Sequence, residues 1–250
     1  MTNTAGKRSF SGVYDQPDPV DYFTSLRPLR YMTPHHAQPV LRAAARAIAR
    51  IRSRAPVEML DLCSGYGVNG ALINHDLSME DLYRHFVRSR GTGQDAALFR
   101  KRRLPVPLAR VTGVDVAENA LAYARGAGLL DDAVRIDLET ASPSADQGRR
   151  LARADMITVT GGFSYVGART LGRLLALFPR DRLPWMLSFP LRHTDFSACE
   201  RVFERFGLQV ESWDRWAYPH RLFADPAERA GVLAAHDPDA DPVAAPPSRS

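Results

Sequence analysis

Cysteine is scarce in this chain, and long apolar runs are absent. Cys63 and Cys199 are the only cysteines among 250 residues, which excludes a disulfide-rich scaffold. No stretch approaches the roughly eighteen consecutive apolar residues that a membrane-spanning helix needs. The first residues also have no apolar core of a signal peptide. We therefore expect a cytoplasmic protein with one main domain and no membrane partner.

Lysine is almost missing, although the chain is basic. Lys7 and Lys101 are the only lysines, so the net charge of +5 comes from arginine. Such usage beside abundant alanine and proline is typical of codon bias, and it argues against a surface selected for nucleic acid. The seven histidines show no metal-ligand spacing, so no metal is expected.

Composition divides the chain into three regions. Residues 1–33 mix prolines with aromatic residues and predict short helical pieces that form an N-terminal lid. Residues 34–224 carry the periodic apolar patterns of the main domain. Residues 225–250 turn polar and rich in proline, which predicts a mostly disordered C-terminal extension.

Strand and helix patterns alternate through the main domain. The expected strands lie at 57–62, 109–116, 133–138, 154–160 and 183–190. Thr33 or Pro34 is expected to begin a first helix, and an insertion at about 74–108 predicts a further capped helix and a basic loop. Residues 208–213 and 216–224 have no helix between them and predict a closing hairpin. This alternation is typical of an α/β fold with a mostly parallel sheet.

A cluster of small residues follows the first expected strand. It reads Asp61-Leu-Cys-Ser-Gly65-Tyr-Gly67 and leads directly into a helix. Because glycine has no β-carbon, the backbone can turn sharply there and a ligand can approach its N–H groups. A tight turn without any ligand would have the same sequence, so this cluster does not decide the function.

Two further acidic residues end the next two strands. Asp115 ends the second strand, where a carboxylate can accept both hydrogens of a ribose diol, and Asp137 ends the third, where it can accept from the amine of adenine. Val116 and Leu138 would then contact the faces of the ring. Since ligands of such sheets bind beyond the carboxyl ends of the strands, the three positions together predict a nucleoside site.

With these three positions the sequence resembles the class I S-adenosylmethionine-dependent methyltransferases. The first motif of that family is an acidic residue followed by three alternating glycines, and Cys63 replaces the first glycine here. The resemblance implies a Rossmann-like three-layer sandwich, with a seven-stranded sheet whose last strand is antiparallel. It also implies S-adenosylmethionine as cofactor, Asp61 near its amine, and Ser64 to Gly67 around its amino-acid end.

A nicotinamide-binding domain is the main alternative fold family. It would place its acidic residue about twenty positions beyond the glycines, and Asp115 comes much later.

Methyl transfer is expected beyond the fourth strand, where Thr160 lies beside the predicted sulfonium position. The Asn/Asp-Pro-Pro-aromatic motif is missing there, which argues against an amide or nucleobase acceptor. Tyr165 is the first candidate to orient the nucleophile or accept its proton, and His193 is the second. Tyr31, in the N-terminal lid, offers an aromatic face to a sulfonium cation.

The sequence leaves the reaction open. The first hypothesis is a methyltransferase acting on a small molecule in specialised metabolism. In the second, an amine, from the cofactor itself or from an acceptor, attacks the aminopropyl carbon. Methylthioadenosine then leaves, and the product is of the azetidine-2-carboxylate or aminocarboxypropyl type. An RNA methyltransferase that uses Arg100 to Arg103, and a non-catalytic cofactor-binding protein, rank behind these two. A homodimer is left open.

Overall fold

A parallel sheet forms the centre of the computed structural model, which describes residues 11–89, 94–191, 194–213 and 217–234. The described sheet has five strands in the order β3-β2-β1-β4-β5. These are β1 (Val57–Leu62), β2 (Ala109–Asp115), β3 (Asp132–Arg135), β4 (Met156–Val159) and β5 (Trp185–Ser188). From the central β1 the chain runs outward to β2 and β3, then returns to add β4 and β5 on the other side. Strand order therefore reverses between β1 and β4.

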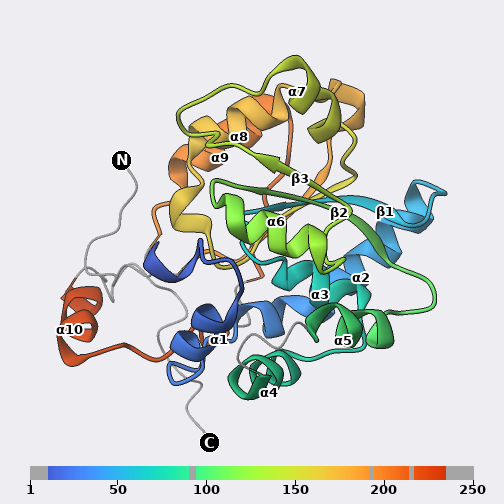
Figure 1. Cartoon of the computed structure of the whole chain (residues 1–250). Coiled ribbons are helices and arrows are strands. Elements are labelled where there is room, and N and C mark those ends of the chain that lie inside the picture. The colour runs from blue at the N-terminus through green and yellow to red at the C-terminus, as the bar shows by residue number, and fades with distance from the viewer. Residues whose placement is uncertain (1–10, 90–93, 192–193, 214–216, 235–250) are drawn as a thin grey trace, which may run out of the picture.

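Helices cover both faces of the sheet (Figure 1). They are α1 (Val20–Leu26), α2 (Thr33–Ile51), α3 (Val68–Asn74), α4 (Met79–Ser89), α5 (Asp95–Arg102), α6 (Glu118–Gly126), α7 (Ala145–Leu151), α8 (Ala168–Leu175), α9 (Ser197–Phe206) and α10 (Pro226–Ala234). Short 3-10 turns are η1 (Ser11–Val13), η2 (Phe163–Tyr165) and η3 (Arg180–Arg182). The predicted start of α2 and the three-layer α/β architecture are confirmed.

Alternate residues of β1 enter two separate apolar cores. Met59 packs in the core below α2, α3 and α6, whereas Leu60 packs in the core below α8 and α9. Side chains of successive strand residues point to opposite faces of a sheet, so an apolar residue at every position indicates burial on both faces. This explains why the expected strands had no polar face.

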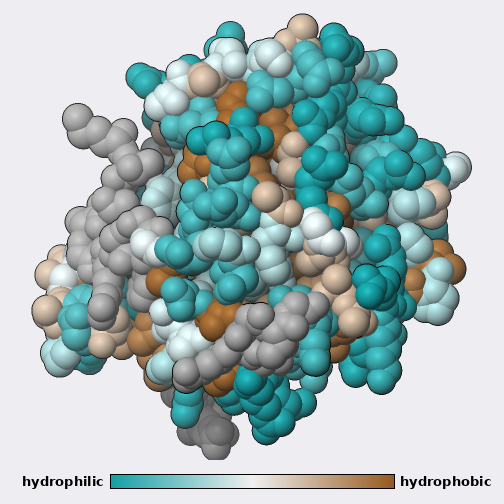
Figure 2. Space-filling model, viewed as in Figure 1, coloured by the Kyte–Doolittle hydropathy of each residue, from teal (hydrophilic) through white to brown (hydrophobic). Residues whose placement is uncertain are grey.

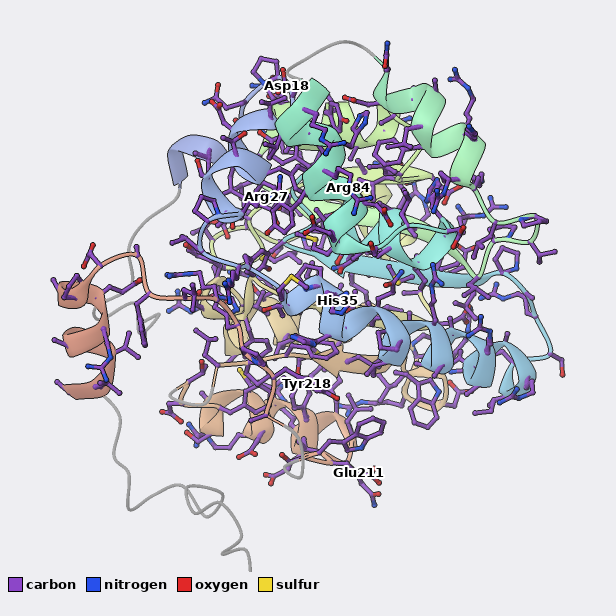
Figure 3. All side chains as sticks on the ribbon, turned by 90° about the horizontal axis from the view of Figure 1, so that it is seen from below. Asp18, Arg27, His35, Arg84, Glu211 and Tyr218 are labelled. Carbon is purple, nitrogen blue, oxygen red and sulfur yellow. The ribbon has the colours of Figure 1, made fainter. Side chains whose placement is uncertain are left out.

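The two closing strands of the expected hairpin are absent from the described residues, so the described sheet has five strands and not seven. Residues 208–213 and 217–224 form no strand. Residues 217–224 pair with the N-terminal segment instead, because Met32 N donates to His220 O at 3.0 Å and Leu222 N to Leu29 O at 2.6 Å. The Tyr218 ring also stacks on His36, with ring centroids 4.8 Å apart. Figure 3 shows Tyr218 on the side of the molecule that carries the start of α2.

The N-terminal segment and the insertion pack on each other. Phe23 of α1 stacks on Phe86 of α4, with centroids 4.5 Å apart and planes 6° apart, and meets Tyr83 edge-on. Ser78 caps α4, since its Oγ accepts from Asp81 N at 3.1 Å. The described part of the expected lid is therefore a packed layer, and the predicted capped helix of the insertion is confirmed.

The C-terminal extension begins with α10, which lies away from the sheet in Figure 1. A buried ion pair between Arg221 and Glu228 holds this helix to the preceding segment. Residues 235–250 lie outside the described residues. No helix in the described ranges is long and apolar enough to cross a membrane.

Figure 2 shows a mainly hydrophilic face on which apolar residues appear in separate spots.

Two helical glycines allow a matched test of packing. A β-carbon at Gly70 in α3 would overlap with the carbonyl oxygen of Leu129, whereas one at Gly172 in α8 would meet no atom within 4 Å. We expect Gly70→Ala to lower the free energy of unfolding by about 2 kcal/mol, because the backbone has to move apart. Gly172→Ala should raise it by about 0.5–1 kcal/mol through helix propensity. Urea denaturation measures both values, and equal effects at the two sites would contradict this packing.

Candidate functional site

The tips of β1, β2 and β3 lie at one edge of the sheet. The parallel register pairs Asp61 with Gly113 and Asp115 with Arg135. Asp137 follows two residues beyond Arg135, at the same edge. The structure thus brings together the three acidic positions that were predicted to share a site.

The loop between β1 and α3 turns through three left-handed residues. Cys63, Gly65 and Gly67 have φ values of 55°, 49° and 73°. A β-carbon at Gly67 would lie 3.0 Å from Ala124 Cβ, so this glycine is required where the loop packs on α6. At Gly65 the same test finds only the Tyr14 ring, at 3.9 Å. Gly65 therefore faces the site, and Gly67 faces the core.

Cys63 adopts a conformation that costs a non-glycine residue about 1–2 kcal/mol. Its side chain fits against Gly162 beyond β4, where any β-carbon would overlap with the cysteine. Its thiol lies 3.7 Å from the carbonyl oxygen of Gly162, within donating distance. Cys63 therefore joins the tips of β1 and β4.

Asp61 is buried at the end of β1, next to the side chains of Asn69 and Ser64. Asn69 Nδ2 donates to Asp61 Oδ1 at 2.7 Å and to Thr160 Oγ1 at 3.0 Å. Burial raises the pKa of Asp61 to about 7; hydrogen bonding from Asn69 and Ser64 opposes this shift, and the charge of Asp115 adds to it. Sequence reasoning missed Asn69, and the only available signal was an amide in the first turn of an otherwise apolar helix.

Asp115 organises the loop as well as facing the site. Its Oδ2 accepts from Gly65 N at 2.8 Å, and its Oδ1 accepts from Val116 N and Ala117 N at 2.7 and 3.0 Å. A carboxylate has about four acceptor positions, and three are occupied. A ribose diol would therefore have to share one of these bonds to donate both hydrogens.

Asp137 is exposed and closes its own turn. Its Oδ1 accepts from Glu139 N and its Oδ2 from Thr140 Oγ1, both at 2.9 Å. Leu138 is buried in the core, whereas Val116 is 58% exposed at the neighbouring tip. Val116 is thus the apolar side chain that is open to a ring in this structure. The adenine roles of Asp137 and Leu138 stay predictions.

The N-terminal segment crosses the starts of α3 and α6. The Tyr66 hydroxyl accepts from Gln16 N at 2.8 Å, and Asp15 Oδ1 accepts from Asn119 N at 2.8 Å. These bonds place Tyr14 over Gly65. The Tyr14 residue is 37% exposed, and partial desolvation raises its pKa; the charges that act on it include those of Tyr165, Arg221 and Asp115.

Those three groups therefore lie near Tyr14, and sequence reasoning missed both Tyr14 and Arg221. Tyr14 is an aromatic residue in a proline-rich N-terminal segment, and Arg221 is one of many arginines. Neither position therefore gives a distinct signal in the sequence.

Tyr31 is buried at the tip of β4. A β-carbon at Gly161 would overlap with its hydroxyl, so the phenol lies directly on that glycine. The His220 ring meets Tyr31 edge-on at 5.2 Å, and His220 Nδ1 lies 2.7 Å from Thr33 Oγ1. Burial raises the pKa of Tyr31 well above its ordinary value, which keeps the phenol neutral.

The two predicted catalytic residues have different outcomes. Tyr165 lies in η2, 57% exposed, close to Tyr14. His193 lies outside the described residues. Among the described side chains, no group of three or more histidine, cysteine, aspartate or glutamate residues is arranged to hold a metal ion.

No family model and no curated protein matches this chain. Solved structures with partial likeness include a TehB-like SAM-dependent methyltransferase from Corynebacterium glutamicum, at 18% identity and TM-score 0.39, over 73% of this chain and 81% of that chain. The plantazolicin methyltransferase BpumL, solved with SAH, gives 15% identity and TM-score 0.39, over 81% and 62% of the two chains.

DesVI from Streptomyces venezuelae gives 17% identity and TM-score 0.33, over 74% of this chain and 58% of that chain. This chain thus spans less than two thirds of BpumL and of DesVI. Likeness of this degree carries no conclusion about function, which has to be argued from the residues.

The raised pKa of Asp61 gives a stability test. Because the folded carboxyl holds its proton up to about pH 7 and the unfolded one only to about 3.8, stability falls as pH rises between these values. Asp61→Asn keeps an acceptor for Asn69 and has no charge to bury. Between pH 5 and pH 8, we expect the free energy of unfolding of the wild type to fall by about 3 kcal/mol relative to that of Asp61→Asn. Urea denaturation at each pH measures both values. Parallel pH profiles would contradict the buried carboxyl.

Proposed function

We propose that this chain is an S-adenosylmethionine-dependent methyltransferase that acts on a small molecule. The observation that carries the proposal is the left-handed glycine loop at Gly65, which lies beside Asp61 and Asp115 at the edge where strand order reverses, with the Tyr14 ring above it. In open α/β sheets this edge is where nucleotide ligands bind.

The charge of the site favours this cofactor over a dinucleotide. Asp61 and Asp115 lie on either side of the glycine loop, and both disfavour the pyrophosphate that a dinucleotide would place there. S-adenosylmethionine instead brings an ammonium and a sulfonium, two cations. The acidic loop therefore matches its amino-acid end, and the tips of β2 and β3 would take its nucleoside.

The reaction needs alignment more than acid–base chemistry. S-adenosylmethionine would supply the methyl group of its sulfonium to the nucleophile of the acceptor and would leave as S-adenosylhomocysteine, so the chain mainly has to hold and align the two. Tyr14 and Tyr31 line the N-terminal side of this space and would exclude water. Tyr165, which is exposed and lies near Tyr14, would orient an acceptor or accept its proton.

A small acceptor suits the surroundings better than RNA. Segments from both ends of the chain, around Tyr31 and His220, wall the tip of β4. Part of the basic run is engaged within the chain: Arg102 Nε donates to Asp76 O at 2.7 Å, and Arg103 contacts Gly128 O at 3.5 Å.

Product analysis tests the reaction. Purified protein is incubated with S-adenosylmethionine alone and with the small-molecule fraction of a cell extract, and the nucleoside product is identified by mass. We expect S-adenosylhomocysteine, and only when the extract is present. Methylthioadenosine as the product would contradict methyl transfer and indicate attack on the aminopropyl chain.

Asp115→Ala tests the nucleoside position. We expect it to weaken S-adenosylmethionine binding about 10- to 100-fold in calorimetry, because it removes charged hydrogen bonds to the ribose and frees Gly65 N. Asp181→Ala, an exposed aspartate in η3, is the matched control and should bind as wild type. Unchanged affinity of Asp115→Ala would contradict the proposed cofactor site.

A further inference from the structure

Asp61, Asn69 and Thr160 form a buried polar group where strand order reverses. They come from β1, the first turn of α3 and the residue after β4, and are 0%, 6% and 7% exposed. Asn69 Nδ2 donates 2.7 Å to Asp61 Oδ1 and 3.0 Å to Thr160 Oγ1. A single amide therefore connects the two strand tips that border the switch point.

Two acceptors of this group have no donor. The buried Ser64 hydroxyl lies near Asp61 and lowers its pKa, but among the described residues no hydrogen bond of good geometry reaches Asp61 Oδ2 or Asn69 Oδ1, and both atoms are shut off from water. An unsatisfied buried acceptor costs folding free energy, and more when it carries charge. The group therefore has capacity for N–H donors that the described chain does not use.

A positively charged partner fits this group best. The titratable groups that face Asp61 are Asp115 from β2 and the buried phenols of Tyr22 and Tyr31 from the N-terminal segment. None of these three is a cation, and Asp115 disfavours a second negative charge nearby. An ammonium group offers both the charge and the N–H donors, whereas a neutral nucleoside offers neither at this position.

We propose that Asn69 is a positioning residue that, together with Thr160, holds Asp61 to receive the α-ammonium group of the cofactor. This rests on the proposed function and adds a rule of specificity to it. The site selects nucleosides that carry an amino-acid chain over those that end at the thioether. Because Asn69 Nδ2 is bonded on both sides, the amide plane is fixed, and its oxygen can accept a second N–H of the same ammonium.

Calorimetry with two nucleosides separates this role from general support of the fold. S-adenosylhomocysteine carries the α-ammonium, and 5′-methylthioadenosine has the same adenosine without the amino-acid chain. We expect Asn69→Ala to weaken S-adenosylhomocysteine about tenfold and methylthioadenosine less than twofold. Thr160→Val should weaken S-adenosylhomocysteine about threefold, and Thr160→Ser, which keeps the hydroxyl, should restore wild-type affinity.

The pH dependence of nucleoside affinity gives a second test, because a purely structural role of Asp61 and Asn69 would not make it differ between the two nucleosides. With a pKa of about 7 for Asp61, its ionised fraction rises roughly tenfold between pH 6 and pH 8. Since the ammonium binds the ionised carboxylate, wild-type affinity for S-adenosylhomocysteine should rise by about that factor. The affinity for methylthioadenosine should stay constant, and Asp61→Asn should remove the slope.

Equal loss of both nucleosides in Asn69→Ala, or the same pH profile for both in wild type, would overturn the inference and leave the proposed cofactor in place. Thermal melting of each variant shows whether it is folded. If neither nucleoside binds the wild-type protein, the proposed function fails and this inference fails with it.

Discussion

The hydrogen bond from Gly65 N to Asp115 Oδ2 joins the tips of β1 and β2, and the candidate site depends on it. It holds the left-handed turn in which Gly65 lies under Tyr14 while Gly67 packs on α6. The same carboxylate also accepts from the two N–H groups that begin the next helix. The conformation of the loop between β1 and α3 thus determines where a ligand could approach the backbone. The carboxylates of Asp61 and Asp115 make this site acidic.

Both ends of the described chain complete the site from outside the sheet. The N-terminal segment places Tyr14 over Gly65 and Tyr31 over Gly161. The C-terminal segment lies against it through His220, and the buried pair of Arg221 and Glu228 ties α10 to that segment. These contacts explain why residues 217–224 form no sheet hairpin: their backbone groups bond to the N-terminal segment. These two segments would therefore govern access to the proposed cofactor position and acceptor side.

Local patterns predicted the parts of the fold that local physics determines. Apolar runs located all five described strands, and the glycine loop was recognised because only a few residue types fit its backbone. Partners far apart in the sequence were not predictable, since neither Asn69 nor Tyr14 differs in type or spacing from ordinary helix and loop residues. Leu138 shows the same limit, because strand alternation did not reveal that its side chain enters the core.

Hydrogen exchange of the full chain, with and without saturating S-adenosylhomocysteine, tests most directly whether three strand tips hold one nucleoside. The account predicts slower exchange in the peptides that cover residues 61–68, 114–118 and 136–140, with α9 unchanged. Protection that misses these peptides, or that reaches only one of the three, would contradict it.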